Sequence, residues 1–177
     1  MKKNAIEMFV EDIKISLENN CYYAALALAL TLPDICGKIM YPEINTVGER
    51  YKKWFDYYIG DFEQSPFYNN KNSLNDMPYL NGEVCYSLRC AFLHQGENDL
   101  QKRRIKSISL DEFTLIIEPY NEFNLYCDSA SNINGKHKTL NIQIRNLCNK
   151  IIWVIEELIN KGEIDLKKDP FLSISEL

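Results

Sequence analysis

Apolar residues recur every three or four positions over much of the chain, which is the period of an amphipathic helix. Residues 4–18 have this pattern, with Glu and Lys on the opposite face. The run 21–32 is almost wholly apolar and predicts a helix that is buried on most of its faces. Pro33 suits the first turn of a further short helix, which we expect to span residues 33–40.

Two more helices are predicted, and each begins with an N-terminal signal. Thr46 and Glu49 have the spacing of a capping box, and we expect the helix that follows them to stop at Gly60. Asn81 suits the N-cap of the next helix, and residues 61–78 between the two helices predict a surface loop. The aromatic residues of the first of these helices have helical spacing and are expected in the core rather than on a base-stacking surface: Tyr51, Trp54, Phe55, Tyr57 and Tyr58.

The pattern changes to β-branched and aromatic residues after about residue 106. These stretches predict a small antiparallel β-hairpin or sheet, inserted at about 107–140, with a turn signal at 132–135. A long apolar stripe then predicts a last helix over 141–161, and the tail 163–177 is expected to be poorly ordered. The predicted strands cover residues 107–110, 113–118, 123–128 and 136–140.

Length and composition indicate one ordinary globular domain. The chain has 177 residues, of which 46% are hydrophobic and 25% charged, and this length is sufficient to bury a core without disulfides. The sequence contains no internal repeat or interdomain linker, so we assign residues 1–177 to a single domain. Its expected class is mainly α, a helical bundle of four to five main helices with the small β insertion.

The charge limits the partners that the protein can have. The formal net charge is -5 and the isoelectric point about 5.1. Because a protein that wraps long stretches of duplex is usually basic, extensive nucleic-acid binding is disfavoured. A small site for one or two phosphates remains compatible with this charge.

The cysteines and the apolar runs bear on the compartment. The chain has 6 cysteines but no CxxC pair, which argues against a zinc ribbon or a thioredoxin-type site. The N-terminal residues lack the apolar segment of a signal peptide, and the longest apolar run, 21–32, is shorter than a membrane span. We therefore expect a cytoplasmic protein with reduced thiols and no contact with a membrane.

Arg89 and His94 have the clearest potential for chemistry. An arginine can stabilise the charge of a phosphoryl transition state, and a histidine can move protons near neutral pH. Together they suffice for metal-free RNA cleavage by the ribose 2′-hydroxyl. Five helical residues correspond to about 140° of rotation, so we expect the helix to loosen near His94, or both side chains to meet in a cleft with another chain. The alternative is structural, with Arg89 in a surface ion pair and His94 at the last carbonyls of the helix.

Steps of four, three and four residues give this segment one polar helical face, made of Glu83, Ser87, Cys90 and His94. Glu83 is a candidate orienting residue, for a ligand or for Arg89. Cys90 and His94 would form only half of a metal site, so we expect no metal and no cofactor. Cys90 as a nucleophile activated by His94 is chemically possible, but we favour the alternative that Cys90 is a small buried hydrophobe.

A basic run follows this helix and is a candidate for contacts to phosphate: Lys102, Arg103 and Arg104. The alternative is an ordinary solvated loop, which is the usual role of a charge run. His137, the other histidine of the chain, lies beside the predicted hairpin turn and is expected at the surface.

The segment 83–96, EVCYSLRCAFLHQG, resembles the signature helix of the HEPN superfamily, whose helical domains carry an R-x4-6-H motif. Arg89 and His94 match this motif at the x4 spacing, near the end of a late helix. The upstream stretches ALALTLPDICGKIMYP and VGERYKKWFDYYIGDF are similar to a recurrent bacterial family of unassigned function that carries the same helix. The helical order extends the likeness to roughly half of the chain.

The resemblance implies a homodimer in which Arg89 and His94 of both chains line one cleft. It also implies RNA as the substrate, no metal and a cyclic-phosphate product, as in an endoribonuclease of phage defence, a toxin–antitoxin system or a stress response. An antitoxin or a defence protein would then be a further partner. Active members usually have a polar residue after the arginine, whereas this chain has Cys90, and the basic domain lacks the β insertion. The first departure favours the alternative function, a catalytically inactive HEPN-like dimeric module that binds a nucleotide, RNA or protein.

Overall fold

The computed structural model describes residues 4–63, 79–94, 105, 110–117, 127–131 and 138–166. Over these residues the chain is mainly helical with a small sheet, which confirms the predicted class. The helices are α1 (Ala5–Glu18), α2 (Tyr22–Ala29), α3 (Leu32–Met40), α4 (Val47–Phe55), the π-helical turn η1 (Asp56–Gly60), α5 (Asp61–Glu63), α6 (Gly82–His94) and α7 (Ile144–Asn160). The strands are β1 (Glu112–Ile116), β2 (Cys127–Ser131) and β3 (Lys138–Gln143).

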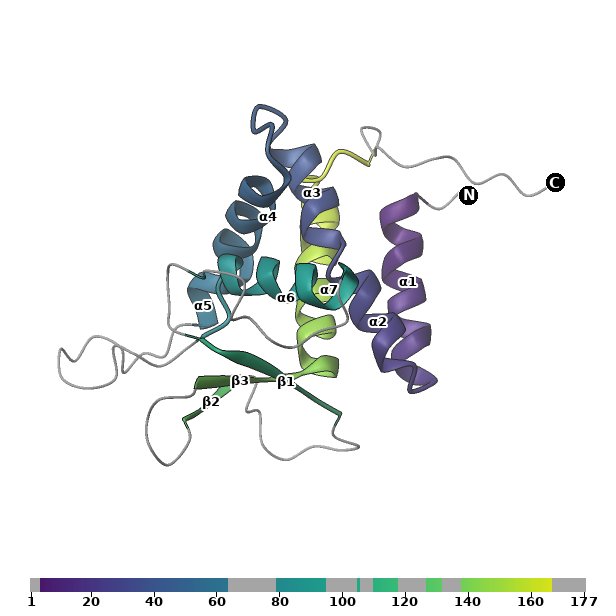
Figure 1. Ribbon diagram of the computed structural model, residues 1–177. Coiled ribbons are helices and arrows are strands. Elements are labelled where there is room, and N and C mark those ends of the chain that lie inside the picture. Colours follow the sequence, from purple (N-terminus) through teal and green to yellow (C-terminus); the bar gives the residue numbers. More distant parts are fainter. Residues whose placement is uncertain are drawn as a thin grey trace.

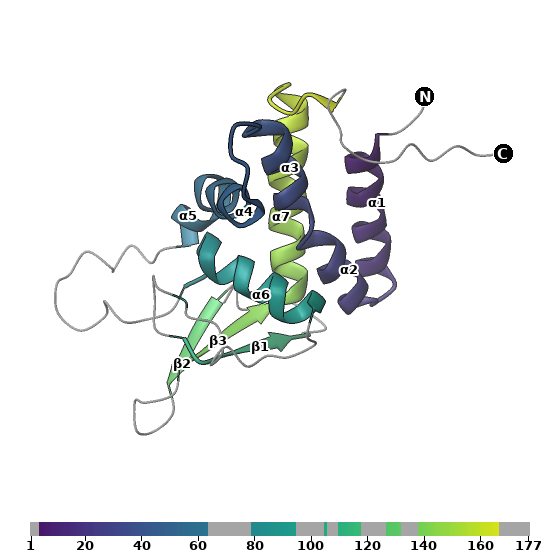
Figure 2. The ribbon, with the colours of Figure 1, turned by 45° about the horizontal axis from the view of Figure 1, so that its top comes forward.

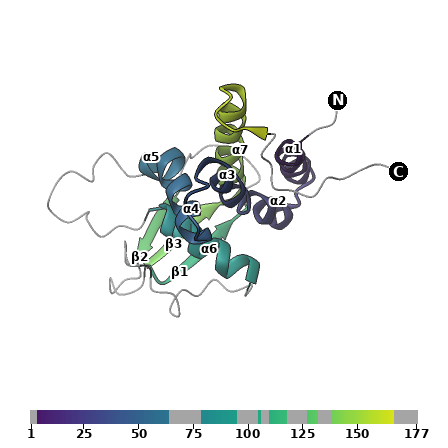
Figure 3. The same cartoon turned by 90° about the horizontal axis from the view of Figure 1, so that it is seen from above.

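Helix α7 stands at the centre of the bundle, with α1 and α2 on one side and α4 and α5 on the other (Figure 1). Helix α6 crosses the bundle and lies between the other helices and the sheet, which is placed at the end of the bundle where α7 begins (Figure 2). Seen from above, α2 and α3 lie beside α7, whereas α4 and α6 lie over the sheet (Figure 3). Helix α4 contacts both α3 and α6, so these three helices meet at α4.

The sheet has the order β1-β3-β2, with β3 in the middle. Strands β2 and β3 are antiparallel, but β1 and β3 are parallel, with Phe113 opposite Leu140. The prediction of an antiparallel sheet is therefore wrong for β1 and β3. Residue patterns identify strand-like segments but not the order in which they pair. Here the first two strands along the chain, β1 and β2, form the edges of the sheet, and the last strand, β3, lies between them. The central place suits β3, because its Leu140 and Ile142 are fully buried.

The helix after Thr46 differs from its prediction at both ends. The Thr46 hydroxyl donates to the Glu49 carboxylate instead of accepting from the backbone, so the predicted capping box is wrong. At the other end the helix does not stop at Gly60 but continues through η1 into α5. A Cβ on Gly60 would lie 2.7 Å from Oδ1 of Asp56 and 3.3 Å from Cα of Asn81. Gly60 is thus required for close packing of the chain, not for a helix end.

The other helices follow their predicted ranges closely. Helix α1 begins at a capping box, in which the Asn4 side chain accepts from the Ile6 amide at 2.9 Å. Residues 141–143 extend β3, so α7 begins later than the sequence indicates. Of the predicted core aromatics, Tyr51, Trp54 and Phe55 are buried, which confirms them, whereas Tyr57 is exposed and Tyr58 is half-buried.

The segment Tyr22–Met40 is long and apolar enough to cross a membrane when judged by length and composition. Half of its most apolar window is buried inside the protein. The core helices of soluble proteins and N-terminal signal sequences both meet the same criterion. This segment covers α2 and α3 and includes Asp34, which takes part in the site described next.

Candidate functional site

Helix α6 is fixed against α4 and η1 at its N-terminus. The Asn81 side chain accepts from the Val84 amide at 2.9 Å, which confirms the predicted N-cap. The Gly82 amide donates to Oδ1 of Asp56 at 2.5 Å. A Cβ on Gly82 would lie only 2.5 Å from the carbonyl oxygen of Lys52, so only glycine allows this approach. These contacts determine where the rest of α6, including Arg89, is placed.

The open side of α6 is not the polar face that the sequence predicts. Ser87 and Cys90, two of its four residues, are buried. Burial of Cys90 confirms its interpretation as a small hydrophobe, and its sulfur is a free thiol. The partly exposed residues form a different stripe, which winds around α6 by about 60° at each step of three residues. They are Glu83, Tyr86, Arg89 and Phe92, with Leu93 beside the last.

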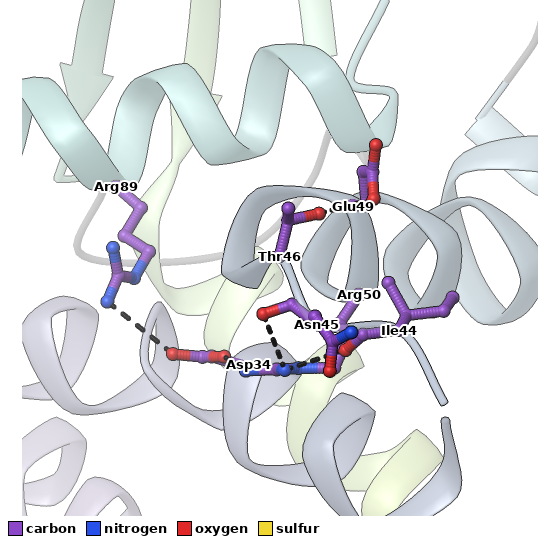
Figure 4. Close-up of polar contacts among 7 residues, drawn as sticks. All are labelled: Asp34, Ile44, Asn45, Thr46, Glu49, Arg50 and Arg89. Carbon is purple, nitrogen blue, oxygen red and sulfur yellow. Dashed lines mark hydrogen bonds and ion pairs between the residues drawn. The ribbon is translucent and has the colours of Figure 1, made fainter. Parts of the chain in front are cut away.

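Arg89 reaches from α6 to Asp34 on α3 (Figure 4). Its Nη2 lies 3.8 Å from Oδ2 of Asp34, while Nη2 of Arg50, on α4, lies 3.7 Å from Oδ1. The side chains of Arg89, Asp34 and Arg50 are 17%, 25% and 12% exposed. The structural alternative expected Arg89 in a surface ion pair, and the ion pair exists, but it is mostly buried. We call these three residues the Asp34 cluster.

The Asp34 cluster holds one more positive charge than negative charge, because a single carboxylate faces two guanidinium groups. Arg50 also donates from Nη1 to the carbonyl oxygens of Ile44 at 2.8 Å and Asn45 at 3.4 Å, which fixes the segment before α4 (Figure 4). The Nε atoms of Arg50 and Arg89 are buried and have no hydrogen-bond partner. A buried donor without a partner costs folding free energy, so these two Nε–H groups do not add to the stability of the cluster.

Two tyrosine rings line the guanidinium of Arg89. Its Cζ lies 6.0 Å from the ring centroid of Tyr51 and 5.9 Å from that of Tyr86, within the range of cation–π attraction. Burial, followed by the neighbouring Cys90, raises the pKa of Tyr86 above its ordinary value. Burial also raises the pKa of Tyr51 well above its ordinary value, with Cys85 as the next cause. Both phenols are thus neutral at pH 7 and can donate hydrogen bonds but cannot serve as bases.

Helix α6 remains α-helical through His94, the other residue of the motif. The expected loosening of the helix before His94 is therefore not observed in the backbone. Positions 89 and 94 point about 140° apart on such a helix. The side chain of His94 lies outside the described part of the structure. The backbone alone therefore does not direct both residues to one ligand, and the other expectation from the sequence, a cleft shared with a second chain, stays a prediction.

Of the other residues that the sequence predicts for the site, the structure describes Glu83 but not the basic run. Glu83 lies in the first turn of α6 and is partly exposed, on the same stripe as Arg89. Lys102, Arg103 and Arg104 lie outside the described residues, as does His137. Within the described ranges, no group of three or more His, Cys, Asp or Glu residues could hold a metal ion.

Sequence reasoning missed Asp34 and Arg50, although one signal for Asp34 was present. It is the only acidic residue in the apolar stretch from Tyr22 to Met40. A carboxylate in such a helix needs a cationic partner, because the cost of burying an unpaired charge is high. Arg50 stands among other charged residues and gave no comparable signal.

Comparison with known proteins adds no relative: no family model, no curated protein and no solved structure matches this chain. The function of the chain therefore has to be inferred from the site itself and from the resemblance of its sequence motif.

Proposed function

We propose that this protein is a HEPN-like, metal-independent endoribonuclease that acts as a homodimer. The observation that supports the proposal most is the Asp34 cluster, which holds Arg89 on the partly open stripe of α6, in the same helix that ends at His94. An arginine fixed in this way costs little reorganisation when a phosphate approaches. Its cluster has a positive excess that one phosphate could neutralise.

In the proposed reaction the 2′-hydroxyl oxygen of a ribose attacks the adjacent phosphorus. His94, the acid and base of the reaction, accepts the proton of that hydroxyl and gives a proton to the 5′-oxygen as the P–O5′ bond breaks, which leaves a 2′,3′-cyclic phosphate. Arg89 stabilises the additional negative charge on the phosphoryl oxygens in the transition state. Glu83, on the same stripe as Arg89, is the candidate orienting residue. No step requires a metal.

The second chain has a defined purpose in this proposal. Since positions 89 and 94 diverge by about 140° on one helix, a single copy does not direct both residues to one phosphate. Two copies of α6 across a twofold axis would place the motif residues of both chains along one cleft. The cellular role would be phage defence, a toxin–antitoxin system or a stress response, in which cleavage of RNA stops growth.

A second function is supported by the same cluster. The guanidinium of Arg89 is already paired with Asp34 and is mostly buried, and buried Cys90 replaces the polar residue that is usual after this arginine. Both features suit a non-catalytic dimeric module that binds a nucleotide, RNA or protein through the same stripe. Binding without cleavage is the distinguishing property of this alternative.

The decisive experiment incubates RNA with the purified protein in the presence of EDTA. We expect the wild type to cut RNA and leave cyclic phosphates, and His94→Ala to lose at least 100-fold in rate, since acid–base catalysis contributes about 10²–10⁴-fold. His137→Ala is the matched control and should retain full activity. Expression in bacteria should slow growth only with the wild type and the control. If neither the wild type nor His94→Ala cuts RNA but both bind it, the non-catalytic function is the correct one.

A further inference from the structure

An exposed aromatic pair lies beside the Asp34 cluster. Tyr23 of α2 is 63% exposed, and its ring stacks on that of Phe92 of α6, with centroids 5.9 Å apart and planes only 7° from parallel. Phe92 supports one face of the tyrosine ring. The large exposed fraction of Tyr23 shows that much of the rest of its ring is accessible to solvent. The pair thus presents a flat aromatic surface at the outside of the protein.

The position of this pair relative to Arg89 follows from helix geometry. Phe92 comes three residues after Arg89, so the two lie on one side of α6 with Cβ atoms about 5–6 Å apart. Both belong to the partly exposed stripe of α6, which also contains Tyr86. A cation that suits phosphate and a ring that suits a base therefore lie side by side, within the reach of one or two nucleotides.

We propose that Tyr23, supported by Phe92, is a stacking surface for one base of single-stranded RNA whose phosphate is bound at Arg89. This inference deepens the proposed function and rests on it for the choice of RNA. Stacking suits an unpaired base, because bases inside a duplex already stack on their neighbours. It also tolerates any sequence, since every base has a π-face.

The surroundings of Tyr23 favour a nucleotide over a second protein chain. The exposed residues next to it in the chain are small or polar: Asn19, Asn20, Cys21 and Ala24. A protein–protein interface usually has a contiguous apolar core, and none of these four residues is a large apolar side chain. An exposed aromatic ring near a cation is instead the pattern of single-strand binding sites.

The test measures binding without cleavage, so that it does not depend on catalysis. A labelled single-stranded oligoribonucleotide is titrated with the full-length His94→Ala protein, with and without Tyr23→Ala. We expect Tyr23→Ala to raise the Kd roughly 5- to 150-fold, the effect of one lost stacking contact. Tyr23→Trp should bind as well as the parent. The matched control is Tyr57→Ala, because Tyr57 is a tyrosine of similar exposure, 66%, whose ring meets that of Tyr58 edge-on.

An abasic oligonucleotide of the same length identifies the base as the ligand. The parent protein should bind it more weakly than the ordinary strand, and Tyr23→Ala should bind both strands alike. Absence of RNA binding by the parent, or an equal loss in Tyr57→Ala, would overturn the inference. So would a change of oligomeric state in Tyr23→Ala, measured by size-exclusion chromatography with light scattering, because Tyr23 would then lie between copies of the chain. If base-dependent binding is found but the wild type cuts no RNA, only the ribonuclease proposal fails.

Discussion

At the scale of single residues, the physics of a partly buried charge explains the Asp34 cluster. Three charged side chains that are mostly withdrawn from water are stable together only because opposite charges face each other. The contacts at 3.7 and 3.8 Å are ion pairs without close hydrogen bonds. Asp34 therefore acts chiefly by neutralising charge, and its carboxylate orients Arg89 less tightly than a bidentate pair would.

The need of the two arginines for a counter-charge predicts the effect of Asp34→Asn. The substitution keeps the shape of the side chain but leaves Arg50 and Arg89 without a counter-charge, and we expect it to lower the free energy of unfolding by about 2 kcal/mol at pH 7. Urea denaturation followed by circular dichroism measures the change. Glu43→Gln is the control, because the contact of Glu43 with Lys53 at 3.8 Å joins two exposed side chains. It should cost less than about 1 kcal/mol, and an equal loss in both variants would contradict the role of burial.

Among the secondary-structure elements, α6 packs against α4 at two glycines, Gly82 and Gly48, which differ in how much space surrounds them. The Cβ that Gly82→Ala adds would collide with backbone, whereas a Cβ on Gly48, in α4, would lie 3.2 Å from the movable ring of Tyr86. We expect Gly82→Ala to cost about 3 kcal/mol by overpacking. Gly48→Ala should change stability by less than about 1 kcal/mol, because the gain in helix propensity offsets the contact. Thermal unfolding of both variants tests this, and a smaller loss in Gly82→Ala than in Gly48→Ala would contradict it.

The bond between Asp56 and the start of α6 should depend on pH. Burial raises the pKa of Asp56, and the hydrogen bond from Gly82 lowers it by less. Because the folded pKa lies above the unfolded one, the folded state binds the proton more tightly. The stability that Asp56 contributes is therefore complete at low pH and is lost as the pH rises through the folded pKa.

Asp56→Asn tests this dependence, since an amide oxygen can still accept from Gly82 but carries no charge. We expect the variant to gain stability relative to the wild type as the pH is raised from 4 to 7. Melting temperatures of both proteins across this range give the comparison. Glu63, whose pKa is also raised by burial, is present in both proteins and cancels in the difference. A constant difference between the two proteins would show that the charge of Asp56 has no cost in the folded state.

The elements also show what could be predicted from the sequence and what could not. Helical periodicity and the N-cap Asn81 located the start of α6, because these signals are local. The order of the strands, the role of Gly60 and the partner of Arg89 depend on residues far apart in the chain, which no local pattern specifies. The prediction of a polar face on α6 failed for the same reason, because the neighbouring elements determine which side of the helix is buried.

At the scale of the whole molecule, α7 connects the parts of the fold. It contacts α1, α2, η1 and β3, so the bundle and the sheet share one helix. The side chains of Lys150 and Glu63 form an ion pair that fastens the short α5 to α7. The hydrophobic core accordingly forms one continuous cluster that includes residues of both the helices and the sheet. A core of this kind should unfold in a single cooperative transition.

The two tryptophans allow this prediction to be tested. Trp54 is fully buried in α4, whereas Trp153 is exposed on α7, so in Trp153→Phe the fluorescence reports only the burial of Trp54. We expect its urea transition to coincide with that of circular dichroism. In the same background, Ile155→Ala removes a fully buried side chain of α7 and should lower the free energy of unfolding by about 2–5 kcal/mol for both signals alike.

Ile15→Ala is the matched control, because Ile15 is the same residue type on α1 but is largely exposed. It should change the free energy of unfolding by less than about 1 kcal/mol. Two transitions with separate midpoints in Ile155→Ala would mean that α4 stays folded when α7 is weakened. The Asp34 cluster, which joins α3, α4 and α6, would then belong to a unit that is stable without α7. Coincident transitions would instead show that the same cooperative core keeps α7 folded and holds Arg89 in place.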